Sequence, residues 1–493
     1  MSKDLKKKLF SLNSIVLLLI ITAGAFFRFY NTPERYGFDQ DPARDGVIAK
    51  FAAENLNIPL TGPHSGVGEF AFGPWYYYQL IAAEVLIPAD FAPWIYLSIV
   101  SLVFVFIMYL IGKELGDNRL GLILAFFAAL SPSITGPTSG LSNPNFIPFF
   151  TSLFILVTVK YLKYKNISYL WIFTWGASFA LGLSHHYQMA GLIFLPLLTL
   201  FFKRENLHKI IPVFIAGILA MLLPTIIFEY LTGWYNTKGI WMYVTRGGEG
   251  IYVPNSWTIY IKDFWFQFFA YVAGVPQIIG IPLLFLGTAI IAYNTLKKKL
   301  NPYFLVIFLT LLINVVLLRF YPGQREYYYT LYLIPMLIVF IGYLFYTLLK
   351  IKLGTTIVLL ILLVMAPFIF QEDWERLGTR EDFIKIRGDA NTLIDRYPEN
   401  NISIYTCGKY PNNYVYGINY FLLKNANNSP VDNDKMIGFK GEECPDNNTY
   451  GSIEEIEGVE LPENKEATLT EQRWKKVTPE SIYSDTVNWW KND

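Results

Sequence analysis

Three carboxylates and an arginine lie close together just after the first apolar segment of the chain. They are Asp39, Asp41, Arg44 and Asp45. If Pro42 opens a helix at its first turn, Asp41 and Asp45 share one helical face. A carboxylate that is partly removed from water beside another carboxylate has a raised pKa and can act as a general base toward a hydroxyl group. The plainer alternative is that Asp41 caps a helix, and the spacing alone leaves both readings open.

Arginines occur in the loops that we expect on the outer side of the membrane. The set comprises Arg35, Arg44, Arg246, Arg319 and Arg325. Arginine holds a phosphate through fixed, bidentate hydrogen bonds. Glycines follow Arg246 directly and would let backbone amides approach an anion there. Each arginine alone is also explained by contact with lipid headgroups, but several of them beside acids favour an anionic lipid substrate.

Polar side chains of a third kind are candidates for binding sugar or acceptor hydroxyls. They are His64, His186 and Gln188, with a purely structural role at the membrane interface as the alternative. Metal binding by histidine is not favoured, because His185 and His186 are adjacent and point apart on a helix, and the chain has no HExxH or CxxC spacing. The net charge of +1 gives no indication of a nucleic-acid partner.

Long apolar segments must position these residues. The 493-residue chain is 53% hydrophobic, and its apolar runs of about 17 to 23 residues are each long enough to cross a bilayer. We expect about eleven membrane-spanning helices, near residues 11–29, 92–112, 119–136, 146–163, 168–184, 188–202, 210–230, 276–294, 302–320, 328–349 and 354–370. This arrangement keeps the lysine-rich short loops cytoplasmic, as the positive-inside rule requires. It predicts a multi-pass protein of the cell membrane with a cytoplasmic N-terminus.

The same topology divides the chain into two parts. Residues 1–370 form a transmembrane domain whose first outer loop, 30–91, contains an apolar but short segment at 73–87 that suits an interfacial helix. Residues 371–493 form a small exterior domain, and the alternation at 402–405 predicts a strand in a mixed α/β fold. Cys407 and Cys444 are the only cysteines, and the sequence leaves open whether they form a disulfide.

The order of these features resembles the large membrane glycosyltransferases of the GT-C type, in particular the protein mannosyltransferase and aminoarabinose transferase group and their bacterial relatives. The resemblance covers about residues 10–350. It rests on four motifs: Asp41-Pro42-Ala43-Arg44 in the first outer loop, Phe72-Gly73-Pro74-Trp75, Ser142-Asn143-Pro144-Asn145, and the tyrosine-rich segment from Arg325 to Pro335. Three departures are clear. Pro42 breaks the acidic pair of the family, and Asn143 stands where some members have a second acid. Phe72-Gly73 replaces the lysine that some relatives use for phosphate before the interfacial helix.

The resemblance implies roles for individual residues. Asp41 would be the catalytic carboxylate, and Asp39 or Asp45 would orient the site. The lipid phosphate of the donor would be bound by Arg44, Arg246 and Arg325. Asn143 and Tyr327 would join the sugar or acceptor site. If a divalent cation such as Mg²⁺ or Mn²⁺ takes part, Asp39 and Asp41 are the residues expected to hold it; no other cofactor is indicated.

By this resemblance we expect an inverting glycosyltransferase that moves a sugar from a polyprenyl-phosphate donor to a hydroxyl of a glycan, lipid or protein on the outer face of the membrane. Two alternatives remain at this point. A transporter or flippase of lipid-linked sugars would also use outer acids and arginines, although the expected span centres carry almost no ionisable residues. A polymerase or ligase using a lipid-diphosphate donor differs only in the number of donor phosphates.

Overall fold

The computed structural model describes residues 12–246, 257–321, 327–398, 402–409, 411–423, 435–444, 451–452, 458–461 and 474–491. The structure is mostly helical. Within those ranges, eight helices are long and apolar enough to cross a membrane, or nine if one bent pair counts as a single span. The eight are α2 (Leu12–Phe29), α5 (Ala92–Leu115), η2 with α8 (Asn143–Lys163), α11 (Leu207–Leu231), α15 (Gln277–Leu296), α16 with η5 (Pro302–Phe320), η6 with α17 (Tyr327–Leu348) and α18 (Gly354–Glu375).

The bent pair consists of α6 (Asn118–Leu130) followed by α7 (Pro132–Thr135) and η1 (Pro137–Ser139), with a bend of 52°. All nine segments coincide with expected spans. The other two expected spans are shorter helices: α9 (Tyr169–His185) has 17 residues, and η3 (Tyr187–Ile193) continues into α10 (Phe194–Phe202). The polytopic helical fold is therefore confirmed, and the count of eleven spans stays a prediction.

Small residues bring the helices of the bundle close together. Gly176 on α9 and Gly217 on α11 face each other so closely that a Cβ at either position would collide with the main chain of the other helix. Close backbone approach through small residues is a common way for membrane helices to associate, since lipid gives no hydrophobic drive between them. Helix α9, which ends at His185, is held against α11 in this way.

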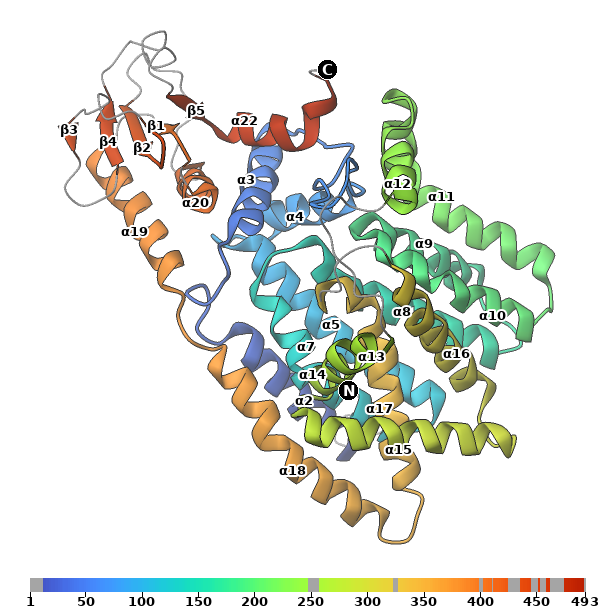
Figure 1. The fold of residues 1–493 in the computed structure, drawn as a ribbon. Coiled ribbons are helices and arrows are strands. Elements are labelled where there is room, and N and C mark those ends of the chain that lie inside the picture. The colour runs from blue at the N-terminus through green and yellow to red at the C-terminus, as the bar shows by residue number, and fades with distance from the viewer. Residues whose placement is uncertain are drawn as a thin grey trace, which may run out of the picture.

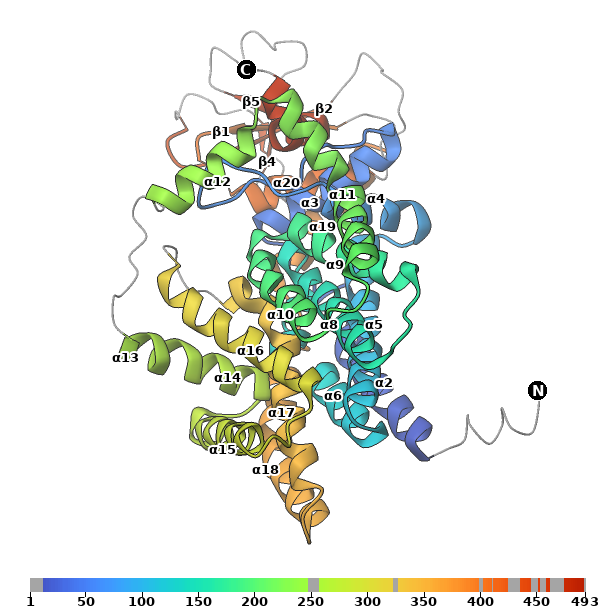
Figure 2. The same ribbon diagram turned by 90° about the vertical axis from the view of Figure 1, so that its right-hand side faces the viewer.

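Shorter elements gather at one end of the bundle (Figures 1 and 2). They are α3 (Gln40–Asn55), α4 (Trp75–Leu86), α12 (Tyr235–Arg246) and the C-terminal segment. Helix α4 has 12 residues and corresponds to the expected interfacial helix of the first loop. Helix α13 (Trp257–Ile259), η4 (Tyr260–Trp265) and α14 (Phe266–Ala273) follow one another in the chain, and α14 packs against α15 and α17.

The C-terminal segment contains a small five-stranded sheet with the order β3-β4-β2-β1-β5. Its elements are α19 (Glu381–Arg396), β1 (Ile402–Cys407), α20 (Asn412–Leu423), β2 (Lys435–Lys440), β3 (Gly451–Ser452), β4 (Gly458–Leu461), β5 (Lys475–Val477), α22 (Pro479–Tyr483), η7 (Ser484–Asn488) and η8 (Trp489–Lys491). Strands β1 and β2 are parallel and connected through α20, and the other pairs are antiparallel. A disulfide joins Cys407 to Cys444, which settles the question that the sequence left open.

The C-terminal segment shares a core with the first loop. Helix α20 packs on α3, where Lys50 Nζ donates to the carbonyl of Tyr420 at 2.7 Å and Gly46 leaves room for the Tyr420 ring. One continuous cluster of buried apolar side chains runs from the membrane helices through α3 to α19 and α20. The composition changes at Gln371, but α18 continues to Glu375. The division at residue 370 thus follows composition, while the packing crosses it.

Candidate active site

A cavity of about 930 Å³ lies where the first loop, the ends of several membrane helices and α12 meet. Most of its wall is aromatic or apolar. The aromatic lining residues are Phe70, Phe72, His186, Tyr187, Tyr243, Phe320, Tyr321, Tyr328, Tyr329 and Tyr332, together with His64. A mostly apolar cleft with a few convergent polar groups is typical of a small-molecule site.

Asp41 is the one carboxylate among the lining residues of this cavity. It lies in the first turn of α3, just before Pro42, and its side chain is 65% exposed. Backbone N–H groups at the start of a helix have no partner within the helix, so this position favours a negative charge. Asp41 Oδ1 accepts a hydrogen bond from Arg44 Nη1 at 2.7 Å, and among the described residues Oδ2 accepts none. One carboxylate oxygen is therefore held while the other is available to a ligand.

Arg44 is held in turn by Asp45, which is buried at 1% exposure. Arg44 Nη2 lies 2.8 Å from Asp45 Oδ1, and the hydroxyls of Tyr76 and Tyr77 on α4 donate to the same carboxylate at 2.9 Å each. Burial raises the pKa of Asp45, and Arg44 partly opposes that shift. Burial lowers the pKa of Arg44, but the neighbouring acids and Tyr77 raise it more, so the arginine stays charged. The predicted pairing of Asp41 and Asp45 on one face is thus mediated by Arg44.

Asp39 has different surroundings. Its side chain is 77% exposed, does not line the cavity and lies 3.6 Å from Arg380 Nη1 in the turn before α19. It precedes α3 but makes no side-chain hydrogen bond to the helix start. The structure therefore separates Asp39 from Asp41, which the sequence had grouped.

His186 and Gln188, which the sequence predicts as sugar- or acceptor-binding residues, line the same cavity. His186 lies between the rings of Phe72 and Tyr329, with ring centroids at 4.7 and 5.6 Å. Gln188 Oε1 is buried and has no hydrogen-bond partner among the described residues. A buried acceptor without a partner is unfavourable, and Gln188 is also one of the residues that line the cavity.

His64 and Asn143 also line the cavity. Trp489 of the C-terminal η8 packs on His64 with ring centroids 4.5 Å apart. Burial lowers the pKa of His64, Arg44 lowers it further, and Glu69 opposes them, so the imidazole is neutral at pH 7. The amide of Asn143 donates to the carbonyl of His185, which connects η2 to the end of α9. Asn143 thus supports the wall as well as lining it.

The remaining expected site residues lie elsewhere. Tyr327 donates to Gln267 Oε1 at 3.0 Å and faces a second pocket instead of this cavity. Its neighbours Tyr328 and Tyr329 do line the cavity. The role expected for Tyr327 in the sugar or acceptor site stays a prediction, while its two neighbours in the tyrosine run lie at the cavity wall. Arg246 ends α12, whose Tyr243 and Val244 line the cavity, but its side chain lies outside the description, and Arg325 lies outside the described residues.

The positions of Asp39, Asp41 and Asp45 in the structure do not fit a metal site. Asp39 is near Arg380, Asp41 is bonded to Arg44, and Asp45 is saturated by Arg44 and two tyrosines. Within the described ranges no group of three or more His, Cys, Asp or Glu side chains is arranged to hold a metal ion. We therefore derive no step through a metal.

Comparison with known proteins identifies the fold. No protein-family model and no curated protein sequence matches the chain. Among solved structures, ArnT from Cupriavidus metallidurans bound to undecaprenyl phosphate superposes with a TM-score of 0.56 at 10% identity, covering 87% of this chain and 92% of ArnT. The oligosaccharyltransferase of Archaeoglobus fulgidus superposes with a TM-score of 0.55 at 13% identity, covering 84% of this chain.

The chain spans 64% of the length of that oligosaccharyltransferase. A further structure of the same archaeal enzyme, in complex with Zn and sulfate, gives a TM-score of 0.54 at 15% identity. Both neighbours are membrane glycosyltransferases of the GT-C type. The protein therefore has the GT-C fold, and the resemblance that the sequence motifs indicated is confirmed at the level of fold.

Proposed function

We propose that the protein is an inverting glycosyltransferase that moves a sugar from a polyprenyl-phosphate donor to a hydroxyl acceptor on the outer side of the membrane. The observation that carries this proposal is the position of Asp41, held by Arg44 at the wall of a 930 Å³ aromatic cavity. The fold supports it, because ArnT, which superposes on most of this chain, was solved with undecaprenyl phosphate bound.

In the proposed reaction, Asp41 Oδ2 accepts the proton of the acceptor hydroxyl. The hydroxyl oxygen forms a bond to the anomeric carbon on the face opposite the donor phosphate. The bond between that carbon and the phosphate oxygen breaks, and the electron pair leaves on the polyprenyl phosphate. Back-side attack inverts the anomeric configuration. General-base assistance of this kind contributes about 10²- to 10⁴-fold to a rate.

Arg44 acts in this scheme as a positioning residue. Its guanidinium is occupied by Asp41 on one side and Asp45 on the other, so it fixes the direction of the Asp41 carboxylate. This changes the role implied by the family resemblance, in which Arg44 binds the donor phosphate. We therefore assign stabilisation of the leaving phosphate to Arg246 and Arg325. In the sequence, Arg246 follows cavity-lining residues of α12, and Arg325 lies between two groups of cavity-lining residues.

The sugar would bind between the aromatic wall and the polar groups of the cavity. Gln188 Oε1 would accept a hydrogen bond from a sugar hydroxyl, with His64, His186 and Asn143 nearby. The donor chain would lie in the bilayer. This placement of the donor requires the topology predicted from the lysine-rich loops, in which the cavity and the C-terminal segment lie on the outer side of the membrane. The acceptor is a hydroxyl of a glycan, lipid or protein.

The test uses the purified chain in lipid, radiolabelled undecaprenyl-monophosphate sugars and a membrane extract as acceptor. Wild type is compared with Asp41→Asn and with Asp39→Asn, a matched carboxylate that does not line the cavity. Label transfer that is lost in Asp41→Asn and kept in Asp39→Asn supports the proposal. Equal transfer by wild type and Asp41→Asn would overturn the assignment of Asp41. Transfer only from diphosphate donors, or movement of labelled lipid across the bilayer without transfer, would favour the alternative enzyme or the transporter.

A further inference from the structure

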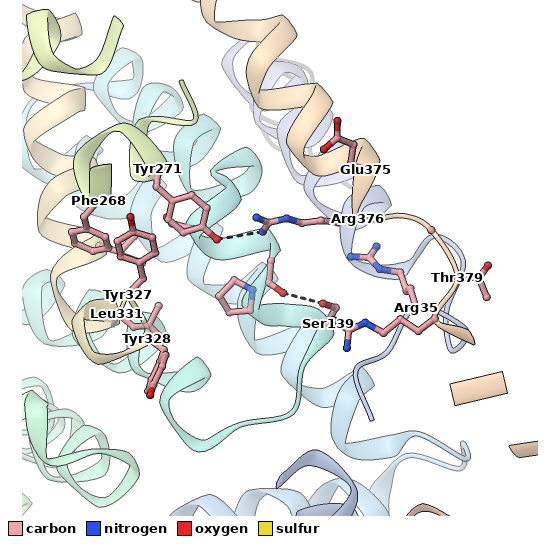
Figure 3. A pocket seen from close by; sticks show the side chains of 16 residues that line it. Arg35, Ser139, Phe268, Tyr271, Tyr327, Tyr328, Leu331, Glu375, Arg376 and Thr379 are labelled. Atoms are coloured by element: carbon pink, nitrogen blue, oxygen red, sulfur yellow. Dashed lines mark hydrogen bonds between the residues drawn. The ribbon is translucent and has the colours of Figure 1, made fainter. Parts of the chain in front are cut away.

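A second pocket, of about 620 Å³, shares lining residues with the active-site cavity. Figure 3 shows this second pocket from close by. Its wall comes from the loop after α2, from η1, α14 and η6, and from the turn between α18 and α19. Three arginines and one glutamate line it, namely Arg35, Arg376, Arg380 and Glu375. The formal charge of these groups is three minus one, or +2. None of these arginines was given a role in the proposed transfer reaction.

Arg35 is the most buried of the three, at 3% exposure. Its Nη1 donates to the carbonyl of Phe27 at 2.6 Å, but its Nε is buried and has no hydrogen-bond partner among the described residues. No described carboxylate forms an ion pair with it. Burial lowers the pKa of Arg35, and the charge of Arg376 lowers it further, although Tyr36 and Asp373 act in the opposite direction. A buried cation that lacks a direct ion pair is costly, and a bound anion would offset that cost.

The other two arginines are held at the rim of the pocket. Arg376 Nη1 donates to the carbonyl of Pro132 at 3.0 Å and to the hydroxyl of Tyr271 at 3.3 Å, as Figure 3 shows for the tyrosine. Its Nη2 lies 3.1 Å from Glu372, which is exposed. Arg380 is half exposed and lies 3.6 Å from the exposed Asp39. Exposed ion pairs of this kind are weak, so both guanidinium groups can accept a new anionic partner.

We infer that this pocket binds a phosphate group, held by Arg35, Arg376 and Arg380. Guanidinium groups match phosphate oxygens with paired, charge-assisted hydrogen bonds. The pocket lies at the end of α18, a helix with exposed apolar side chains at Leu359, Leu360, Leu363 and Val364, so a phosphate carried by a membrane lipid could reach it along that face. A free phosphate would use the same three arginines.

The phosphate pocket adjoins the active-site cavity. Pro137 and Tyr328 line both, so the two spaces share part of their walls. Helix η6 carries Tyr327 on the phosphate-pocket side and Tyr329 on the cavity side. The phosphate pocket is therefore a site in addition to the Asp41 cavity. It is tested by binding alone, so its failure would be distinguishable from failure of the proposed transferase activity.

The experiment measures binding to the full-length protein in detergent by thermal shift and by isothermal titration calorimetry. The probes are inorganic phosphate, dihexanoyl phosphatidic acid and, as the uncharged match, dihexanoyl glycerol. The variants are Arg376→Gln and Arg380→Gln. Arg387→Gln is the control, because Arg387 lies on α19 with similar exposure, pairs with Glu34 at 3.9 Å and does not line the pocket.

We expect saturable binding of the phosphate probes and not of dihexanoyl glycerol. Loss of a charge-assisted hydrogen bond weakens binding about tenfold or more, so affinity should fall by that factor in Arg376→Gln and Arg380→Gln and stay unchanged in Arg387→Gln. Tighter binding of phosphatidic acid indicates a lipid source, and equal affinities indicate free phosphate. If Arg376→Gln does not fold, the affinity measured for Arg380→Gln tests the inference, because Arg380 is half exposed. Absence of saturable binding, or equal losses in all three variants, would overturn the inference.

Discussion

Arg44 Nη1 lies 2.7 Å from Asp41 Oδ1, and this contact joins a carboxylate at the cavity wall to a buried polar cluster behind it. The cluster consists of Asp45, Tyr76 and Tyr77, and it fixes Arg44 from the protein interior. Asp41 is thereby held by a chain of contacts that begins in the core. A catalytic group is effective only when its own rotamer is fixed by surrounding packing and hydrogen bonds.

The first prediction concerns the direction of the Asp41 carboxylate. Arg44→Gln removes the contact that holds Asp41 and also leaves the Asp45 carboxylate buried without its ion-pair partner. Breaking a buried pair in this way costs about 3–5 kcal/mol of stability. We expect a lower unfolding temperature together with a rate that falls at least about tenfold. Arg44→Lys restores charge but not the bridging geometry, so it should recover stability more than rate. Full activity in Arg44→Gln would contradict the positioning role.

A second prediction separates two of the three consecutive tyrosines of α4 from the third. Tyr76→Phe and Tyr77→Phe each remove a hydroxyl that donates to buried Asp45 at 2.9 Å. Loss of a donor to a buried charged group costs about 1–3 kcal/mol. Tyr78→Phe is the control, because Tyr78 makes no contact with Asp45 in the described structure. Thermal unfolding in detergent should show a clear decrease for the first two variants and little change for the third.

The third prediction concerns Gln188. Gln188→Leu removes a buried acceptor that has no partner among the described residues, so we expect stability to be kept. If a donor sugar uses this acceptor, kcat/KM should fall about tenfold. Gln267→Leu is the matched control, because Gln267 bonds Tyr327 outside the cavity. It should affect stability more than kcat/KM. The reverse pattern in the two variants would remove Gln188 from the sugar site.

The fourth prediction is a pH dependence of stability that arises from His64. Its pKa is lowered below 6.5 in the folded protein, mainly by burial. As the pH falls below about 6.5, the unfolded chain therefore binds a proton before the folded protein does, and the folded state loses stability. His64→Gln should lose less stability than wild type between about pH 7 and pH 5.5. Exposed His208→Gln, which serves as the control, should follow wild type. Identical pH dependence in all three proteins would contradict the burial argument.

The fifth prediction concerns the disulfide between Cys407 and Cys444, which are 37 residues apart. Closing a loop of that size contributes about 3–4 kcal/mol by the chain-entropy estimate. The double variant Cys407→Ser/Cys444→Ser should destabilise the C-terminal sheet and increase its proteolysis, as followed by limited digestion. Wild type under reducing conditions should behave in the same way. Unchanged protease resistance would show that the sheet is held by its packing alone.

The sequence by itself determined the membrane helices and the local grouping of charged side chains around Asp41. Length and hydropathy are local properties of a segment, so nine of the expected spans coincide with helices in the structure. The spacing of Asp41, Arg44 and Asp45 along one helix is local as well. The tyrosine run before α17 was also visible, although its register toward the cavity was not.

Only the tertiary structure decided which of these groups meet. The tyrosines that hold Asp45 lie 31 and 32 residues away, on a different helix. The phosphate pocket brings Arg35 together with Arg376 and Arg380 from distant parts of the chain. The C-terminal segment, which composition presents as a separate domain, packs through Tyr420 onto α3. Burial and charge pairing depend on how elements pack, and periodicity along one segment carries no information about that packing.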